Sequence, residues 1–531
     1  PRSSTAWSTT FFATSTVLRD AREIPEGAVL ETDVCIIGAG AAGITLAREL
    51  ARAPCRVTVL ESGRLTASRR TQRLLRGDRA GVPYFPLDWI RTAALGGTTD
   101  QWGGQCRPLD EIDFEARPEI PGSGWPFGRA HLLPYYERAQ AICQLGPFDY
   151  DAAAWRDPAT EPPLPFEGDR ARTAIFQLSP PVRFGLTYRE DLARAAGVTV
   201  HLGASATELE VADGGRTVSH VRVACFRGPR FRVAARLVVL AAGGIETPRL
   251  LLLSNRVHPA GLGNAHDLVG RHFMEHLHLD GGTFEPGDPA FSPALYQPHL
   301  VGSTCIKGAL VLSPETLRQE GLLGYSALLE SRRPTGLSPW RRVARRLLPD
   351  GVLWRIRTRR ARRLRNRGWE PAGRGALQRR PMTLTVHTRM EQAPNPESRV
   401  TLGTGLDALG RRRVRLDWRL AALDRRSMRR ALAILGEEVA RAGLGRWEAG
   451  LDGDDLRWPV LPFGGHHHMG TTRMHPDPRR GVVDEHGRVH GTTNLYVAGP
   501  SVFPTVGYAT PMLTIVALAL RLADHVQARL A

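Results

Sequence analysis

The sequence has few cysteines, a single lysine and no long apolar run. Its six cysteines are scattered among 531 residues without C-x-x-C or metal-finger spacing, which argues against a disulfide scaffold and a zinc module. Such usage is typical of a reducing compartment, so we expect a cytoplasmic protein. No stretch reaches the ~20 apolar residues of a membrane span. The first 25 residues lack an apolar run behind a basic start, so no secretory signal is expected, although a removed leader stays an alternative.

Acidic residues are outnumbered by basic ones, 53 against 71, and every basic residue except Lys307 is arginine. Of the formal net charge of +18, a local +15 lies between Arg332 and Arg380, where 17 arginines face only Asp350 and Glu370. The rest of the chain is therefore nearly neutral, and we expect no nucleic-acid partner. For this Arg-rich insert, 332–380, we favour a solvated lid. A membrane-surface contact, steering of an anionic substrate and docking of an electron-accepting protein are the alternatives.

A strand–turn–helix–strand pattern opens the chain, whose 531 residues exceed the ~250–300 that one hydrophobic core supports. Residues 32–37 have the composition of a buried parallel strand and lead into Gly38-Ala39-Gly40-Ala41-Ala42-Gly43. Residues 44–53 are typical of a helix, and residues 56–60 form a second strand that ends at Glu61. The pattern predicts a βαβ unit.

The three glycines of this turn, Gly38, Gly40 and Gly43, have G-x-G-x-x-G spacing. Glycine lets the backbone approach a pyrophosphate closely, and the helix amino end adds unpaired N–H groups and a positive dipole. Glu61, 18 residues after Gly43, can accept ribose hydroxyls and disfavours a 2′-phosphate. The alternative is a tight turn beside an exposed glutamate. The pattern predicts a dinucleotide, either NAD or FAD.

Further motifs follow in order along the chain. They are Leu95-Gly96-Gly97-Thr98-Thr99, Gly124-Trp125-Pro126 with Pro134-Tyr135-Tyr136, and segments 240–248, 267–271, 391–395, 466–474 and 494–497. Together with the glycine turn, they resemble the glucose–methanol–choline family of flavin oxidoreductases. The nearest likeness is to sugar and alcohol oxidoreductases of the fructose-dehydrogenase and pyranose-oxidase type.

The resemblance implies an α/β (α+β) fold. A Rossmann-like FAD-binding domain would be assembled from the discontinuous segments 30–275 and 459–531. A β-sheet-based substrate domain would occupy 276–458 and carry the Arg-rich insert, and residues 1–29 would form an amino-terminal arm.

The resemblance also implies a catalytic base in the histidine triplet of the tail. The family motif H-x-x-G-T-x-R-M begins at His467, which we assign as the base because imidazole accepts a proton well near neutrality. Neighbours in an extended segment point in opposite directions, so we expect His466 and His468 to be packing residues. Consecutive histidines rarely converge on one ion, and no metal site is expected.

Two positions depart from the family pattern. Thr510 stands where relatives carry a second active-site His or Asn, and it can hydrogen-bond the substrate oxygen but cannot act as a base. Thr510 followed by Pro511 is also a typical helix start, with the threonine as N-cap. Gln101 stands where several relatives link a His to the flavin, so we expect non-covalent FAD.

By the same resemblance, the cofactor site combines the glycine turn, two later loops and the start of the last helix. Its expected residues are Gly38, Gly40, Ala41, Ala42, Gly43, Glu61, Ser62, Gly96, Gly97, Thr98, Thr99, Gln101, Trp102, Gly103, Ala206, Ala242, Gly243, Thr247, Gly499, Pro500, Thr510, Pro511 and Met512.

These residues predict FAD-dependent oxidation of a small-molecule alcohol, a ring hydroxyl of a sugar, cyclitol or glycosylated natural product. His467 would take the proton while hydride moves to flavin N5. The alternatives are a non-oxidative FAD-containing lyase of the same fold and a binding protein that uses the basic insert. Oxygen, a quinone and a partner protein stay open as electron acceptors.

Overall fold

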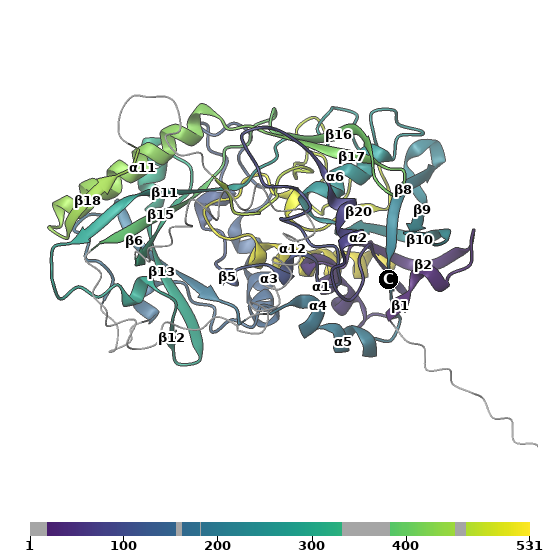
Figure 1. Cartoon of the computed structure of the whole chain (residues 1–531), viewed down its shortest axis with the longest axis horizontal. Coiled ribbons are helices and arrows are strands. Elements are labelled where there is room, and N and C mark those ends of the chain that lie inside the picture. Colours follow the sequence, from purple (N-terminus) through teal and green to yellow (C-terminus); the bar gives the residue numbers. More distant parts are fainter. Residues whose placement is uncertain (1–17, 156–161, 181, 332–382, 452–462) are drawn as a thin grey trace, which may run out of the picture.

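The computed structural model describes residues 18–155, 162–180, 182–331, 383–451 and 463–531. Two large β-sheets stand towards opposite ends of an elongated molecule, and helices α1, α3 and α12 lie between and below them in the view of Figure 1. The Arg-rich insert 332–380 falls outside the described residues, so every expectation about it stays a prediction.

The first sheet has eight strands among the described residues, in the order β1-β7-β3-β2-β10-β9-β8, with β20 beside β10. Their bounds are β1 Leu18–Asp20, β2 Val29–Ile37, β3 Val57–Glu61, β7 Val198–Leu202, β8 Ala204–Ala212, β9 Thr217–Cys225, β10 Arg230–Leu240 and β20 Leu495–Val497. Strands β2, β3, β7, β10 and β20 pair in parallel, and their apolar runs are buried as expected for a sheet covered on both faces.

Three helices pack together against this sheet. They are α1 (Ala41–Leu50), α3 (Arg129–Ile142) and the apolar last helix α12 (Met512–Leu530). The hydroxyls of Tyr136 and Thr514 lie 2.9 Å apart between α3 and α12. The Gln527 side chain in α12 donates to the Glu49 carbonyl in α1 at 3.2 Å, so the end of the chain also packs beside the first helix.

The second sheet has nine strands among the described residues, in the order β18-β11-β15-β14-β13-β6-β5, with β12 beside β13 and β19 beside β11. Their bounds are β5 Gln105–Cys106, β6 Ala171–Leu178, β11 His276–Pro286, β12 His299–Val301, β13 Thr304–Leu312, β14 Tyr325–Ser331, β15 Leu384–Glu391, β18 Gly445–Ala449 and β19 Phe463–Gly464. Helix α11 (Ala422–Arg441) buries Met428, Leu432 and Leu435 in the core of this half.

Smaller elements connect the two halves. A three-stranded sheet joins β4 (Gly77–Gly81) to β17 (Arg412–Trp418) and β16 (Arg399–Leu406). The other α-helices of the described residues are α2 Arg69–Gln72, α4 Phe184–Thr187, α5 Arg189–Arg194, α6 Gly243–Leu253 and α7 Pro314–Glu320.

Sheet membership differs from the predicted segments in three places. β5 and β6 lie in the predicted FAD-binding segment 30–275, yet they pair in the second sheet, and so does β19. β1 lies in the predicted arm 1–29 but pairs with β7. Strand pairing joins residues far apart in the sequence, so a local pattern does not reveal it. The domain boundaries stay a prediction.

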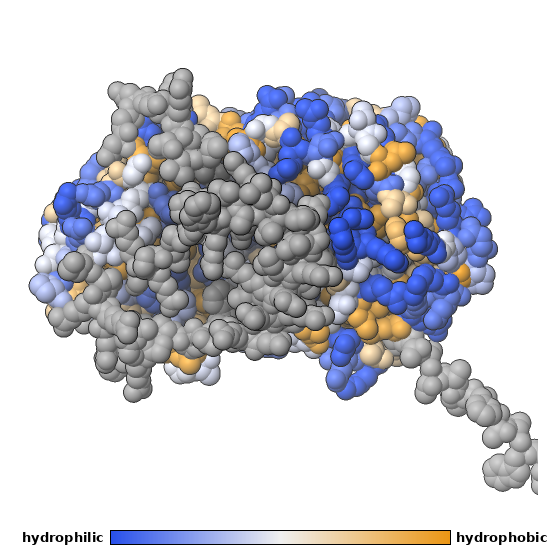
Figure 2. All heavy atoms as spheres, viewed as in Figure 1, coloured by the Kyte–Doolittle hydropathy of each residue, from blue (hydrophilic) through white to orange (hydrophobic). Residues whose placement is uncertain are grey.

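The described part of one face of the molecule is mostly polar. Figure 2 shows hydrophilic side chains over much of the described part of the face in view, with smaller hydrophobic areas between them. Large exposed hydrophobic residues include Phe85 and Trp89, each 36–38% exposed. Among the described residues, no helix combines the length and apolar character needed to span a bilayer. All six cysteines are free thiols.

Candidate active site

A cavity of about 450 Å³ lies where the two halves meet. Its walls come from the glycine turn, the ends of β3 and β10, the loop before β5, the histidine triplet and the start of α12. The predicted cofactor residues on its wall are Gly38, Gly40, Ala41, Ala42, Glu61, Ser62, Gly97, Thr98, Thr99, Gln101, Trp102, Gly103, Ala206, Ala242, Gly243, Gly499, Pro500, Thr510, Pro511 and Met512. The predicted base, His467, lies on the same wall.

Three predicted residues do not line the cavity, and each supports it from behind. A Cβ on Gly43 would lie 1.9 Å from the carbonyl oxygen of Gly38, so this glycine permits close packing of helix and strand. Gly96 has a φ of +94° and donates its N–H to the Ala39 carbonyl at 2.8 Å. Thr247 is fully buried in α6.

The glycine turn has the shape that a pyrophosphate requires. A Cβ on Gly40 or Gly243 would meet nothing within 4 Å, so both positions leave space open beside the backbone. Gly40 is the N-cap of α1 and has no side chain to cap the first N–H groups. These donors and the helix dipole suit an anion.

Glu61 lies at the end of β3 and is buried. One carboxylate oxygen accepts the Ala39 N–H at 3.0 Å and the other accepts the Gly63 N–H at 2.7 Å. Burial raises the pKa of Glu61 to about 7, although both N–H groups oppose the rise. A carboxylate offers about four acceptor sites, so Glu61 can still accept two ribose hydroxyls.

His467 is brought to the cavity by a bulge in the tail segment. Leu277 pairs with Gly464, and Met274 pairs with Met469. Between these two pairings lie four residues of the tail, 465–468, but only two residues of the partner strand, 275 and 276. The excess is accommodated by His466, whose φ is +64°.

The bulge corrects the expectation that the triplet alternates like a regular strand. All three histidines line the cavity. His466 is exposed and its ring lies edge-on to Phe85, with centroids 5.0 Å apart. His468 is buried and stacks on Phe273 at 5.9 Å. Both contact a phenylalanine ring and also line the cavity, so their role as packing residues stays a prediction.

His467 is held through both its side chain and its backbone. Its Nδ1 lies 2.7 Å from Nδ1 of His276, and its backbone N–H donates to Glu275 Oε2 at 2.9 Å. Burial, with the neighbouring His276 and His278, lowers the pKa of His467 well below its usual value. At neutral pH the imidazole is therefore an uncharged proton acceptor.

Thr510 also lines the cavity and has a different role from the predicted N-cap. Its hydroxyl donates to the backbone carbonyl of Gln105 at 2.6 Å, and Pro511 occupies the N-cap position of α12. Because the single hydroxyl proton is used in this bond, Thr510 can offer only an acceptor to a substrate. The long-range contact to β5 overrides the local capping preference.

Sequence reasoning missed His276, His278 and Arg389. His276 and His278 are alternate residues of β11, and Arg389 lies opposite His278 on β15. His278 and Arg389 line the cavity, and Arg389 Nη2 donates to Gln105 Oε1 at 2.8 Å. Burial lowers the pKa of Arg389 to about 10. The His-Leu-His alternation could have marked one face of a strand, but only the pairing with β15 directs that face to the cavity.

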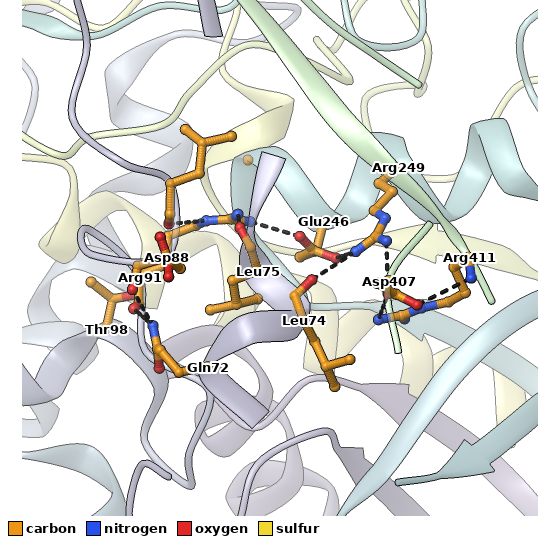
Figure 3. Close-up of polar contacts among 12 residues, drawn as sticks. Gln72, Leu74, Leu75, Asp88, Arg91, Thr98, Glu246, Arg249, Asp407 and Arg411 are labelled. Atoms are coloured by element: carbon orange, nitrogen blue, oxygen red, sulfur yellow. Dashed lines mark hydrogen bonds and ion pairs between the residues drawn. The ribbon is translucent and has the colours of Figure 1, made fainter. Parts of the chain in front are cut away.

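A row of buried charges closes another side of the cavity. Figure 3 shows Arg91, Glu246, Arg249, Asp407 and Arg411 joined end to end. The oxygens of Glu246 accept from the first two arginines at 2.7 and 3.0 Å, and Asp407 accepts from the last two at 2.8 and 2.9 Å. Three cations against two anions leave positive charge beside the site. No cluster of three or more potential metal ligands occurs among the described residues.

Comparison with known proteins agrees with this geometry. The family description "FAD dependent oxidoreductase" matches residues 33–304, and "GMC oxidoreductase" matches residues 394–519. The chain is 28% identical to 6'''-hydroxyparomomycin C oxidase of Streptomyces lividus, over 94% of this chain and 92% of that protein. It is 24% identical to the fructose dehydrogenase large subunit of Gluconobacter japonicus, over 94% and 98%.

The fold is also similar to that of solved structures. The structure of pyridoxine 4-oxidase from Mesorbium loti superposes with a TM-score of 0.52 at 17% identity, over 93% of this chain and 98% of that one. The glycine cradle, the acid at the end of β3 and these matches identify FAD as the cofactor. The chain belongs to the FAD-dependent oxidoreductases, carries the GMC oxidoreductase domain in residues 394–519, and is an FAD-dependent alcohol oxidoreductase.

Proposed function

We propose that the enzyme oxidises a ring hydroxyl of a sugar, a cyclitol or a glycosylated small molecule, with His467 as the base. The observation that carries the proposal is the position of the uncharged His467 imidazole on the wall of the cavity that the glycine turn also lines. Two relatives named for oxidation of a hydroxyparomomycin and of fructose support this substrate class.

Oxidation of an alcohol at this site breaks one O–H bond and one C–H bond, and the proton and the hydride go to different acceptors. His467 takes the hydroxyl proton as the carbonyl forms. When bound, FAD accepts the hydride of the carbinol carbon. Polar side chains from the second sheet, His278 and Arg389 with Gln105, offer hydrogen-bonding groups that suit a polyhydroxylated substrate.

A panel of sugars, cyclitols and aminoglycosides mixed anaerobically with the holoenzyme tests the proposal. We expect at least one of them to bleach the flavin absorbance and to leave as a carbonyl compound. A compound that is cleaved while the flavin stays oxidised would instead identify a lyase.

The rate of flavin reduction should stay constant on the acid side of neutrality. Because the pKa of His467 is well below its ordinary value, the base stays deprotonated at pH values where a free histidine is already protonated. We expect no loss of rate as the pH falls from 8 through about 6.5, the usual histidine pKa. Stopped-flow reduction at saturating substrate measures this, and a rate that halves near pH 6.5 would contradict it.

The flavin should be released without breaking a covalent bond. Gln101 lines the cavity at the position where a histidyl link would form, and its amide donates to the Thr92 hydroxyl. A carboxamide cannot form that link, so acid precipitation should leave yellow FAD in the supernatant. Flavin that stays with the pellet would show covalent attachment elsewhere.

A further inference from the structure

His276 is a buried histidine that contacts the base and not the substrate cavity. It is the first residue of β11 and its side chain is fully buried. Its ring stands edge-on to that of His467, with centroids 4.9 Å apart and Nδ1 atoms 2.7 Å apart. On the other side of the ring, Nε2 lies 2.9 Å from the backbone oxygen of Gly507.

These two contacts determine where the protons lie. A carbonyl oxygen can only accept, so His276 must carry its proton on Nε2. A neutral imidazole has one N–H, so the Nδ1 of His276 is an acceptor. The hydrogen bond between the two Nδ1 atoms then requires His467 to donate from Nδ1. It follows that the Nε2 of His467 carries the lone pair.

The neutral state of His276 follows from its surroundings. Burial and the nearby Arg389 lower the pKa of His276 to about 4. Glu391, its register partner on β15, is engaged by Arg117 at 3.0 Å and by the Gly324 N–H at 2.9 Å. The preceding residue, Glu275, accepts the backbone N–H of His467 and the Tyr84 hydroxyl.

We propose that His276 is a positioning residue that holds the Nδ1 proton of His467 and so makes Nε2 the atom that accepts the substrate proton. This inference rests on the proposed function, in which His467 is the base. A neutral imidazole takes the place that a carboxylate has behind the histidine of a serine protease triad.

The proton balance is complete with this arrangement. The alcohol gives its hydroxyl proton to Nε2 of His467 and its carbinol hydride to the bound flavin, and leaves as the carbonyl compound. The Nδ1–H of His467 can then move towards the Nδ1 lone pair of His276. The two imidazoles share the new positive charge, which a lone buried histidine beside Arg389 would bear alone.

Two variants distinguish a role of His276 in positioning the His467 proton from a role in packing alone. His276→Phe keeps a flat ring without the acceptor, whereas His276→Asn offers an amide oxygen near the place of Nδ1. We expect anaerobic flavin reduction about 10³-fold slower in H276F, since a wrong tautomer in a protease triad costs about 10⁴-fold. We expect the rate of flavin reduction in H276N to lie within about tenfold of the wild-type rate, since weakening one hydrogen bond has an effect of about that size. The substrate dissociation constant and the FAD content should stay unchanged in both.

The control is His201→Phe. His201 is 5% exposed, lies on β7 and is not part of the cavity lining, and burial lowers its pKa to about 4, as for His276. The rate of H201F should match wild type. Equal losses in H276F and H276N, or a wild-type rate in H276F, would overturn the proposal.

The wild-type holoenzyme provides a second test that needs no substrate. Nitrogen-15 spectra of histidine-labelled protein at pH 7, assigned by comparison with His467→Ala, should place the proton of His467 on Nδ1. A proton on Nε2 would overturn the proposal. If the proton is on Nδ1 and no alcohol reduces the flavin, the proposed function fails while the proton placement stands, so the two failures are distinguishable.

Discussion

Replacing His467 by alanine is expected to slow anaerobic flavin reduction by about 10³-fold, within the usual contribution of a general base. Among the described residues, His278, His466 and His468 also line the cavity, but only His467 has its Nδ1 at 2.7 Å from the buried His276. Thr510 cannot take over, since its hydroxyl proton is committed to the Gln105 carbonyl and a threonine is not a base. Rapid mixing under anaerobic conditions measures the rate directly.

FAD should remain bound in H467A, because its cradle consists of the glycine turn and the ends of β3 and β10. The absorbance spectrum of the purified variant checks this. His475→Ala is the matched control: His475 belongs to the same tail segment, lies outside the cavity lining, and its ring Nδ1 accepts the Asp477 N–H at 2.9 Å. Its reduction rate should equal that of wild type. An unchanged rate in H467A would remove His467 from the role of base.

Asp407→Asn should cause the largest loss of stability among single polar substitutions in the row of charges. The Asp407 carboxylate is 1% exposed and accepts from Arg249 and Arg411, as well as from the Leu409 N–H at 2.8 Å. Breaking a buried pair costs about 3–5 kcal/mol because it leaves a buried charge uncompensated. Here two guanidinium groups lose their shared anion, and Glu246 alone remains.

The loss is measured as a lower midpoint of thermal unfolding, followed by the fluorescence of released FAD. Asp417→Asn is the control, because Asp417 pairs at 3.0 Å with Arg419, whose side chain is 55% exposed. An exposed ion pair contributes little to stability, so D417N should have the same midpoint of thermal unfolding as wild type. If D407N also has the wild-type midpoint, the row of charges does not stabilise the fold at the cavity wall.

The βαβ unit could be predicted because its signals are contiguous in the sequence. A buried strand, three glycines, a helix and a terminal Glu61 lie within residues 32–61, and the structure forms β2, α1 and β3 there. The last helix could be predicted for the same reason. Its unbroken apolar face identifies α12 without knowledge of its partners.

Features that depend on distant pairing could not be predicted. The sequence pattern of residues 230–240 predicts two strands, 231–233 and 236–240, but these residues form the single strand β10. Its first half pairs antiparallel with β9, and β2 runs beside it in parallel over most of its length. Likewise, Thr510 looks like a helix cap until β5 brings the Gln105 carbonyl to its hydroxyl.

The positioning histidine was missed for a related reason. The sequence 276–280 alternates polar and apolar residues, which predicts a half-buried strand but not which neighbour faces it. Only the pairings of β11 with β15 and β19 bring His276 to His467. A base could therefore be assigned from its motif, whereas the group that orients it required the structure.

Anaerobic mixing of the wild-type holoenzyme with a substrate deuterated at the carbinol carbon tests the central claim most directly. If the alcohol loses its proton to His467 and its carbinol hydride to the flavin, bleaching must break the C–H bond, and the deuterated alcohol should bleach the flavin several times more slowly. Equal rates for the two isotopologues at saturating concentrations, or turnover of the substrate with the flavin oxidised throughout, would contradict the account.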